Sequence, residues 1–341
     1  MPGTDDAIFP EAEWETSSPE AQGVDGRMLH RALAYLARKS GAQGTEEAVV
    51  IKNGYLIWAG EGSNNRHDVW SCTKSFTSTV FGIMIDRGIC SLDACITELL
   101  PQFPAQLSKL KLVDFATMTS GYDAGGHQSN EPFKPTQFLF EPGTKFCYWD
   151  SAMNQFANIL SHIAGTTLKE IFRQSIADPI GIRSDQWDWG DFGNVDGILV
   201  NGGAGNKARG IQITPQQLAR FGLLFLNGGK WGNRRLISKN WVEEATRVQV
   251  PVTLATHPPG AKGPGVYGYN WWVNGLKPDG GRLWEAAPPK TFAAKGFNNN
   301  ICIVIPEWKM IIVRMGRDGN VDNKIYNKFI MKIKSSIKSH E

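Results

Sequence analysis

The sequence has no apolar run long enough to cross a lipid bilayer, which takes about eighteen or more consecutive apolar residues. It also lacks a dense basic patch, because 33 acidic residues nearly balance 36 Lys and Arg residues and leave a formal net charge of +3. We therefore expect neither a membrane span nor a nucleic-acid partner. The first fifteen residues carry five acidic side chains and no basic one, which is unlike a signal peptide. The protein is expected to be cytoplasmic, or exported with its signal removed.

Cysteine is scarce, and its pattern argues against two further classes of protein. The five cysteines are odd in number and contain no C-x-x-C pair, so neither a disulfide framework nor a cysteine-rich metal site is expected. The six histidines show no H-E-x-x-H or similar ligand spacing. We therefore expect no metal and no other cofactor. The 341 residues, 41% hydrophobic and 20% charged, fit one large globular domain or two closely packed ones.

Strands are predicted near both ends of the chain. Apolar runs at 48–51 and 55–58 flank an Asn-Gly pair, a strong hairpin signal because both residues tolerate positive φ. The β-rich runs 301–305 and 310–313 predict a second strand pair. Apolar residues three or four apart predict a helix outside each pair. They are Leu29, Leu33 and Leu36 before the first pair, and Ile325, Phe329, Ile333 and Ile337 after the second. The five lysines of the last helix indicate a solvated face or, alternatively, an anionic partner.

The middle of the chain has helical periodicity and few strand runs. Phe76, Val80 and Ile83 form an apolar stripe, and residues 154–163 are a second helix candidate.

These patterns predict an α/β (α+β) fold with an antiparallel sheet flanked by helices. Residues 1–65 and 209–341 would form the sheet domain, and 66–208 a mostly helical domain inserted in it. The active site is expected in the cleft between the two.

A Ser-x-x-Lys pattern at the start of a helix can activate a serine hydroxyl, because the amine then lies one turn from the hydroxyl. The pattern begins three times in this sequence, at Ser71, Ser108 and Ser335. Ser335 lies near the C-terminus, and Ser108 lies in a polar stretch after two prolines. Only Ser71, with Lys74, opens a long apolar helix, of about four turns and ending near Gly88. The alternative is that Ser71 only caps this helix.

Two further segments carry candidate catalytic groups. A Pro-Gly turn presents Tyr148 just before the second helix candidate, and a tyrosine can relay a proton if nearby cations lower its pKa. Lys295-Gly296-Phe297 leads toward the strand at 301–305, and its glycine permits close approach of a substrate. The N–H groups of Phe297 and Ser71 would then stabilise an oxyanion. The alternatives are that Tyr148 only packs its ring in a loop, and that residues 295–297 are an ordinary loop before a strand.

Together these segments resemble the serine β-lactamases and penicillin-binding proteins, in particular their class C-like branch with its family VIII-type esterases. That family has S-x-x-K, Y-x-N and K-T-G in this order. Here they correspond to Ser71-Cys72-Thr73-Lys74, Tyr148-Trp149-Asp150 and Lys295-Gly296-Phe297. The resemblance covers roughly residues 20–335. It implies that Ser71, Lys74 and Tyr148 are catalytic, and that Trp149, Asp150 and the 295–297 segment contact substrate.

Two departures from the family pattern bear on chemistry. Asp150 replaces an asparagine, and a carboxylate near Lys74 would hold the lysine as an ammonium. Such an ammonium cannot accept the serine proton, but it would lower the pKa of Tyr148, which favours Tyr148 as base. The 295–297 segment lacks the hydroxyl residue that helps the family bind the carboxylate of penicillins. Its absence favours an ester or amide without that carboxylate.

The predicted function is hydrolysis of a small-molecule carboxylic ester or amide through an acyl-enzyme. The alternatives are a penicillin-binding or sensor protein that is acylated with little turnover, and a β-lactamase or D-amino-acid peptidase. A Ser-His-Asp hydrolase is disfavoured because no G-x-S-x-G is present. Twelve tryptophans, Trp70, Trp149, Trp187 and Trp189 among them, indicate either an aromatic-lined cleft or core packing. The oligomeric state is left open.

Overall fold

A computed structural model describes residues 8–319 and 321–338. Its main sheet has six antiparallel strands in the order β12-β13-β14-β15-β1-β2, so the two ends of the chain build one sheet. The strands are β12 (Trp272–Val273), β13 (Phe292–Lys295), β14 (Ile301–Ile305), β15 (Met310–Arg314), β1 (Ala48–Lys52) and β2 (Tyr55–Ala59). The antiparallel sheet and both predicted strand pairs are confirmed.

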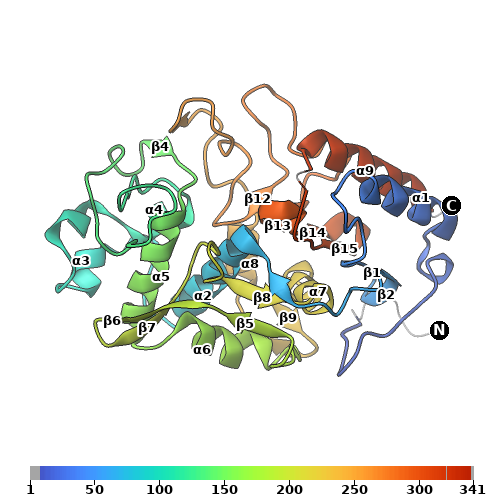
Figure 1. The fold of residues 1–341 in the computed structure, drawn as a ribbon, viewed down its shortest axis with the longest axis horizontal. Coiled ribbons are helices and arrows are strands. Elements are labelled where there is room, and N and C mark those ends of the chain that lie inside the picture. Colours follow the sequence, from blue (N-terminus) through green and yellow to red (C-terminus); the bar gives the residue numbers. More distant parts are fainter. Residues whose placement is uncertain (1–7, 320, 339–341) are drawn as a thin grey trace.

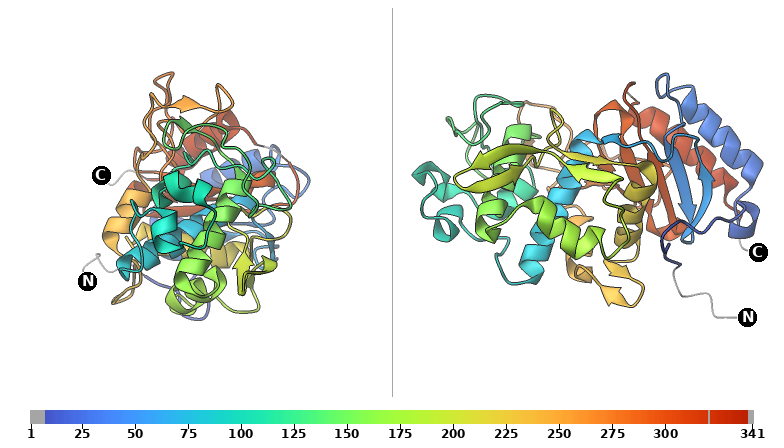
Figure 2. Two further views of the ribbon diagram at one scale, coloured as in Figure 1. Left: turned by 90° about the vertical axis from the view of Figure 1, so that its left-hand side faces the viewer. Right: turned by 60° about the horizontal axis from the view of Figure 1, so that its bottom comes forward.

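Helices cover both faces of this sheet. On one face lie α1 (Gly26–Ala37) and α9 (Asn323–Ser336), which pack side by side (Figures 1 and 2). On the other lies α7 (Pro215–Leu226), against β14 and β15. Because side chains alternate along a strand, Ile303 packs toward the α1 and α9 side while Cys302 and Val304 pack toward α7. Both terminal helices are thus confirmed, except that Ile337 lies just beyond the end of α9.

The β1–β2 hairpin turns at Asn53 and Gly54, which have φ of 56° and 87°. Two successive positive φ values are what a two-residue hairpin with the native strand twist requires. The Asn-Gly signal in the sequence therefore predicted this turn correctly.

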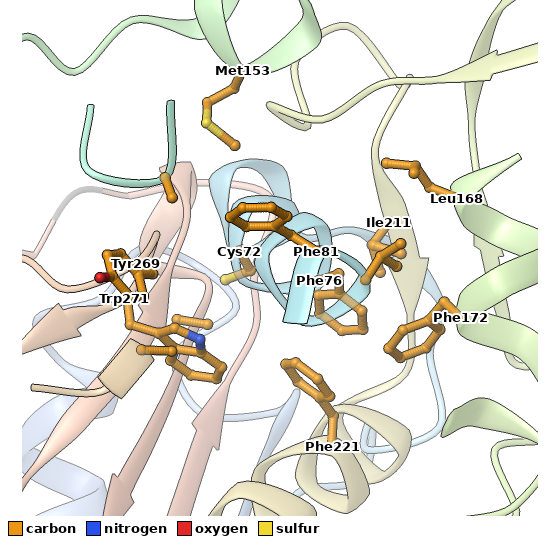
Figure 3. Close-up of a cluster of buried hydrophobic side chains, with 14 of the residues drawn as sticks. Cys72, Phe76, Phe81, Met153, Leu168, Phe172, Ile211, Phe221, Tyr269 and Trp271 are labelled. Carbon is orange, nitrogen blue, oxygen red and sulfur yellow. The ribbon is translucent and has the colours of Figure 1, made fainter. Parts of the chain in front are cut away.

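Helix α2 (Thr73–Asp86) runs through the interior between the sheet and the rest of the chain. Phe76 stacks on Phe221 of α7, with ring centroids 4.1 Å apart, and also contacts Phe172 (Figure 3). On the other side, Phe81 meets Phe156 at 5.2 Å. The helix is buried on nearly all sides, and the hydroxyls of most of its Ser and Thr residues donate to backbone carbonyls, as buried polar groups must.

The middle of the chain is helical but also contains short strands. Its helices are α3 (Ile96–Leu99), α4 (Leu112–Ala116), α5 (Asp150–Ala164) and α6 (Leu168–Phe172). Its strands are β3 (His67–Asp68), β4 (Lys145–Phe146), β5 (Trp187–Trp189), β6 (Asp191–Val195) and β7 (Ile198–Asn201). Beyond it come β8 (Ile211–Ile213), β9 (Lys230–Trp231), β10 (Arg234–Arg235), α8 (Lys239–Ala245) and β11 (Ala255–Thr256). The second helix candidate is α5, whereas the domain boundaries near 65 and 208 stay a prediction.

A three-stranded antiparallel sheet, in the order β3-β8-β5, lies beside α2 and links residues on both sides of the middle region. Within the described residues, none of the helices combines the length and the hydropathy of a membrane span.

Candidate active site

Ser71 lies in a short 3₁₀ turn, Trp70–Cys72, that leads directly into α2. Trp70 has φ of 50°, a left-handed conformation that is uncommon for a bulky residue. Gly205 packs so closely that a Cβ there would lie 2.0 Å from the carbonyl oxygen of Trp70. Close backbone packing thus holds the strained turn that presents Ser71. In the described part of the chain no backbone N–H bonds to Ser71 Oγ, so the structure gives the helix-cap alternative no support.

Lys74 follows one turn later and is almost completely buried, with 1% of its side chain exposed. Its Nζ lies 2.7 Å from Ser71 Oγ, 2.8 Å from Asp150 Oδ1 and 3.0 Å from the carbonyl oxygen of Ala204. Three acceptors match the three N–H donors of an ammonium group. The geometry therefore fits a charged Lys74 that donates to Ser71.

Tyr148 contacts the same pair from the other side. It lies close enough to Ser71 for the serine hydroxyl to affect its pKa, and Lys74 Nζ lies 4.6 Å from its ring centroid. Burial raises the pKa of Tyr148 strongly, the negative charge of Asp150 raises it further, and the nearby Ser71 hydroxyl lowers it only in part. The expectation that a nearby cation lowers this pKa is wrong, because desolvation of the phenolate outweighs the attraction. The resting phenol is protonated at neutral pH.

Asp150 opens α5 and has two partners. Its Oδ1 accepts from Lys74, and its Oδ2 lies 3.6 Å from Nε2 of His127. Sequence reasoning did not find His127, which belongs to none of the three motifs. The adjacent glycines, Gly125 and Gly126, are the sole hint that this loop has an unusual path.

The end of β13 lies against the serine turn. Strand β12 pairs with Phe292 and Ala293 and not with the last two residues of β13. Gly296 has an extended backbone, and a Cβ on it would lie 2.1 Å from the carbonyl oxygen of Val69 and 3.1 Å from the backbone nitrogen of Ser71. This close approach requires glycine and places the end of β13 beside the backbone nitrogen of Ser71.

Lys295 is a cation without a carboxylate partner among the described residues. Its Nζ donates to Asn323 Oδ1 at 3.2 Å and lies 5.9 Å from the ring centroids of Trp272 and Tyr326. Burial, reinforced by the positive charge of Lys262, lowers the pKa of Lys295 to about 8. It is therefore still mostly charged at neutral pH.

These groups surround a cavity of about 530 Å³. Four aromatic residues line it: Trp70, Tyr148, Trp272 and Phe297. The remaining lining residues are Ser71, His127, Gln128, Asp150, Asn206, Lys295 and Gly296. Trp149 is not among them, because its indole packs on His127 and donates to Asp123 Oδ1 at 2.8 Å. Trp187 and Trp189 are core residues.

Asn206 was also missed by sequence reasoning, although its neighbourhood gave a signal. It ends a glycine-rich run in which a Cβ on Gly203 would lie 2.2 Å from the carbonyl oxygen of Met153. Such a run indicates backbones in close contact, here between this segment and α5. Within the described residues, no group of three or more His, Cys, Asp or Glu side chains could hold a metal ion.

A serine bonded to a buried lysine, with a tyrosine beside both at a cavity, is the set of groups that a serine hydrolase of the β-lactamase type requires. The family model described as Beta-lactamase matches residues 37–329, and the chain therefore belongs to the beta-lactamase family.

Known relatives agree in fold and are distant in sequence. A Salmonella agona (strain SL483) protein described as a candidate D-alanyl-D-alanine carboxypeptidase is 21% identical, with 88% of this chain and 85% of that protein aligned. A family VIII carboxylesterase superimposes with a TM-score of 0.67 at 15% identity, covering 92% of this chain and 99% of the other. A penicillin-binding protein homologue from Caulobacter crescentus gives the same TM-score and coverage at 14% identity.

Proposed function

We propose that the protein hydrolyses a small or medium carboxylic ester or amide, with Ser71 as the nucleophile. The observation that carries this proposal is the 2.7 Å hydrogen bond between Lys74 Nζ and Ser71 Oγ beside the cavity. A serine hydroxyl needs a partner at this distance to react at neutral pH. The N–H groups of Ser71 and Phe297 are the proposed oxyanion donors.

The proton of Ser71 is taken by Tyr148. All three N–H groups of Lys74 are engaged as donors, whereas Tyr148 lies close enough to Ser71 for the serine hydroxyl to affect its pKa. In the resting state Tyr148 is a phenol and Lys74 an ammonium. One of the two must lose a proton before Tyr148 can accept the proton of Ser71. Because the two groups lie close together, the pKa of this loss belongs to the pair and not to either residue.

The reaction then balances in two steps. Ser71 Oγ bonds to the substrate carbonyl carbon while its proton passes to Tyr148. The bond from that carbon to the leaving group breaks, and the leaving group takes the proton from Tyr148. Water attacks the acyl-enzyme in the same way, its proton goes to Tyr148, and Ser71 is released with that proton. No cofactor takes part in these steps.

Likeness to a family VIII carboxylesterase and the missing hydroxyl residue in the 295–297 segment favour an ester or amide without a carboxylate. A second candidate has one observation in its favour. Lys295 presents a cation without a carboxylate partner in the described structure, which suits an acyl substrate that carries a carboxylate. Penicillins and D-alanyl peptides have such a group, and the Salmonella relative bears a carboxypeptidase name.

Hydrolysis of p-nitrophenyl acetate and butyrate by the parent and by Ser71→Ala tests the proposal. We expect turnover by the parent and a loss of about 10³-fold or more in the variant. Equal rates would show that Ser71 is not the nucleophile. Mass spectrometry after incubation with benzylpenicillin separates the candidates, because a stable adduct on Ser71 without ester turnover favours the acylated binding protein.

A further inference from the structure

We propose that His127 is a positioning residue that holds the Asp150 carboxylate toward Lys74 through a neutral imidazole of fixed tautomer. The proposal rests on the function proposed for Ser71 and Lys74. His127 has no counterpart in the three motifs, and it reaches Asp150 from a loop separate from α5.

His127 replaces the missing cap of α5. The N-cap residue of this helix, Trp149, gives no side-chain hydrogen bond. Instead, Nδ1 of His127 accepts from the backbone N–H of Asp150 at 3.0 Å, and its carbonyl oxygen accepts from the N–H of Ser151 at 2.9 Å. One residue thus satisfies two of the N–H groups that a helix leaves free at its start. The position of Asp150 is fixed relative to the loop by these two bonds.

The same contact fixes the tautomer of the ring. Since Nδ1 accepts a hydrogen bond, the neutral imidazole carries its proton on Nε2, the atom that lies 3.6 Å from Asp150 Oδ2. A proton on Nδ1 would face the N–H of Asp150 and the positive end of α5. Burial lowers the pKa of His127, Asp150 raises it and Lys74 lowers it, so the ring is neutral at neutral pH.

Among the described residues, Asp150 is the acidic side chain in contact with the ring of His127. Asp150 and Lys74 are the charged groups that act on it, and Trp149 covers it with ring centroids 4.9 Å apart. Asp123 is occupied by the indole N–H of Trp149. The side chain of His127 is 38% exposed and lines the cavity. A substrate seated there removes water from Nε2, and catalytic contacts that are long in the free enzyme shorten in this way.

Two substitutions separate the two contacts of the ring. In His127→Asn the amide oxygen takes the place of Nδ1 and still accepts from Asp150 N–H, but the donor toward Oδ2 is lost. In His127→Gln the amide N–H takes the place of Nε2, and the cap is lost. We expect His127→Asn to keep the parent's melting temperature while kcat falls about tenfold with KM little changed. We expect His127→Gln to keep most of kcat and to melt at a lower temperature, because a lost cap costs about 1 kcal/mol.

A control and a direct reading of the ring complete the test. His30→Gln, an exposed histidine on α1, should match the parent in both measurements. Nitrogen-15 NMR of histidine-labelled protein should show His127 with an unprotonated Nδ1 and a protonated Nε2 at pH 7, identified by its absence in His127→Asn. A protonated Nδ1, or parental kcat in His127→Asn, overturns the proposal. The NMR reading needs no substrate, so it stands apart from any failure of the proposed hydrolase reaction.

Discussion

The Nζ atom of Lys74 lies 2.8 Å from Oδ1 of Asp150, and the two side chains are only 1% and 7% exposed. The Y-x-N pattern of the family has an asparagine where this chain has Asp150, so a full negative charge replaces an amide beside Lys74. In such a buried site an ion pair is screened little by solvent. The carboxylate favours the protonated phenol of Tyr148, because it repels a phenolate.

Asp150→Asn should therefore move the acidic limb of the kcat/KM profile to lower pH. Asp150 raises the pKa of Tyr148, so removing its charge lets the Tyr148–Lys74 pair lose its proton at lower pH. The asparagine oxygen still offers Lys74 an acceptor. The measurement is the rate of p-nitrophenyl butyrate hydrolysis between pH 4.5 and 9.

Asp188→Asn removes the same charge at an exposed ion pair with Lys169 and serves as the control. It should leave the acidic limb in place. If the acidic limb does not move in Asp150→Asn, or moves to higher pH, the carboxylate does not raise the pH at which the Tyr148–Lys74 pair loses its proton.

The framework of the fold could be predicted because its signals are local. The Asn53-Gly54 turn, the apolar runs of β14 and β15 and the stripe on α2 each depend on neighbours in sequence. Ser71 and Lys74 could be found for the same reason, since three residues on a helix fix their distance. The pKa of Tyr148 could not, because it depends on how deeply the folded chain buries the phenol.

His127 and Asn206 escaped prediction because their roles depend on long-range contacts. His127 meets Asp150 across 23 residues of chain, and Asn206 meets Asn154 across 52. No periodicity or spacing encodes such a pairing in one sequence. Trp149, expected in the cavity from its motif position, instead turns to Asp123 and supports the loop.

Gly296→Ala should reduce kcat/KM by about 10²–10³-fold, the effect of losing one oxyanion donor. A Cβ would lie 2.1 Å from the carbonyl oxygen of Val69, so the end of β13 must move away from Ser71 and take the N–H of Phe297 with it. Gly281→Ala, where the nearest atoms belong to flexible side chains, is the control. Full activity in Gly296→Ala would remove Phe297 from the oxyanion site.

Phe297→Ala should selectively lower kcat/KM for substrates with an aromatic acyl group. The residue is 61% exposed, lines the cavity and meets the ring of Trp70 edge-on with centroids 5.4 Å apart, so a substrate can contact it. We expect kcat/KM for p-nitrophenyl phenylacetate to fall about tenfold, whereas the acetate ester changes little. The backbone N–H remains in this variant. An equal loss for both esters would instead indicate a disturbed oxyanion site.

Lys295→Met should make the protein more stable at pH 7, because it removes a buried cation without a carboxylate partner in the described structure. The pKa of Lys295 is lowered from 10.5 to about 8, mainly by burial, and a difference of this size corresponds to at most about 3 kcal/mol. The unfolded lysine keeps its proton to a higher pH than the folded one. Between pH 8 and pH 10.5 the parent's free energy of unfolding therefore rises relative to that of the variant, and the difference between the two free energies narrows. Urea unfolding of the parent and the variant at pH 7 and pH 9.5 measures both free energies.

A variant less stable than the parent at pH 7 would contradict this prediction. It would show that Asn323 and the rings of Trp272 and Tyr326 stabilise the ammonium more than burial disfavours it.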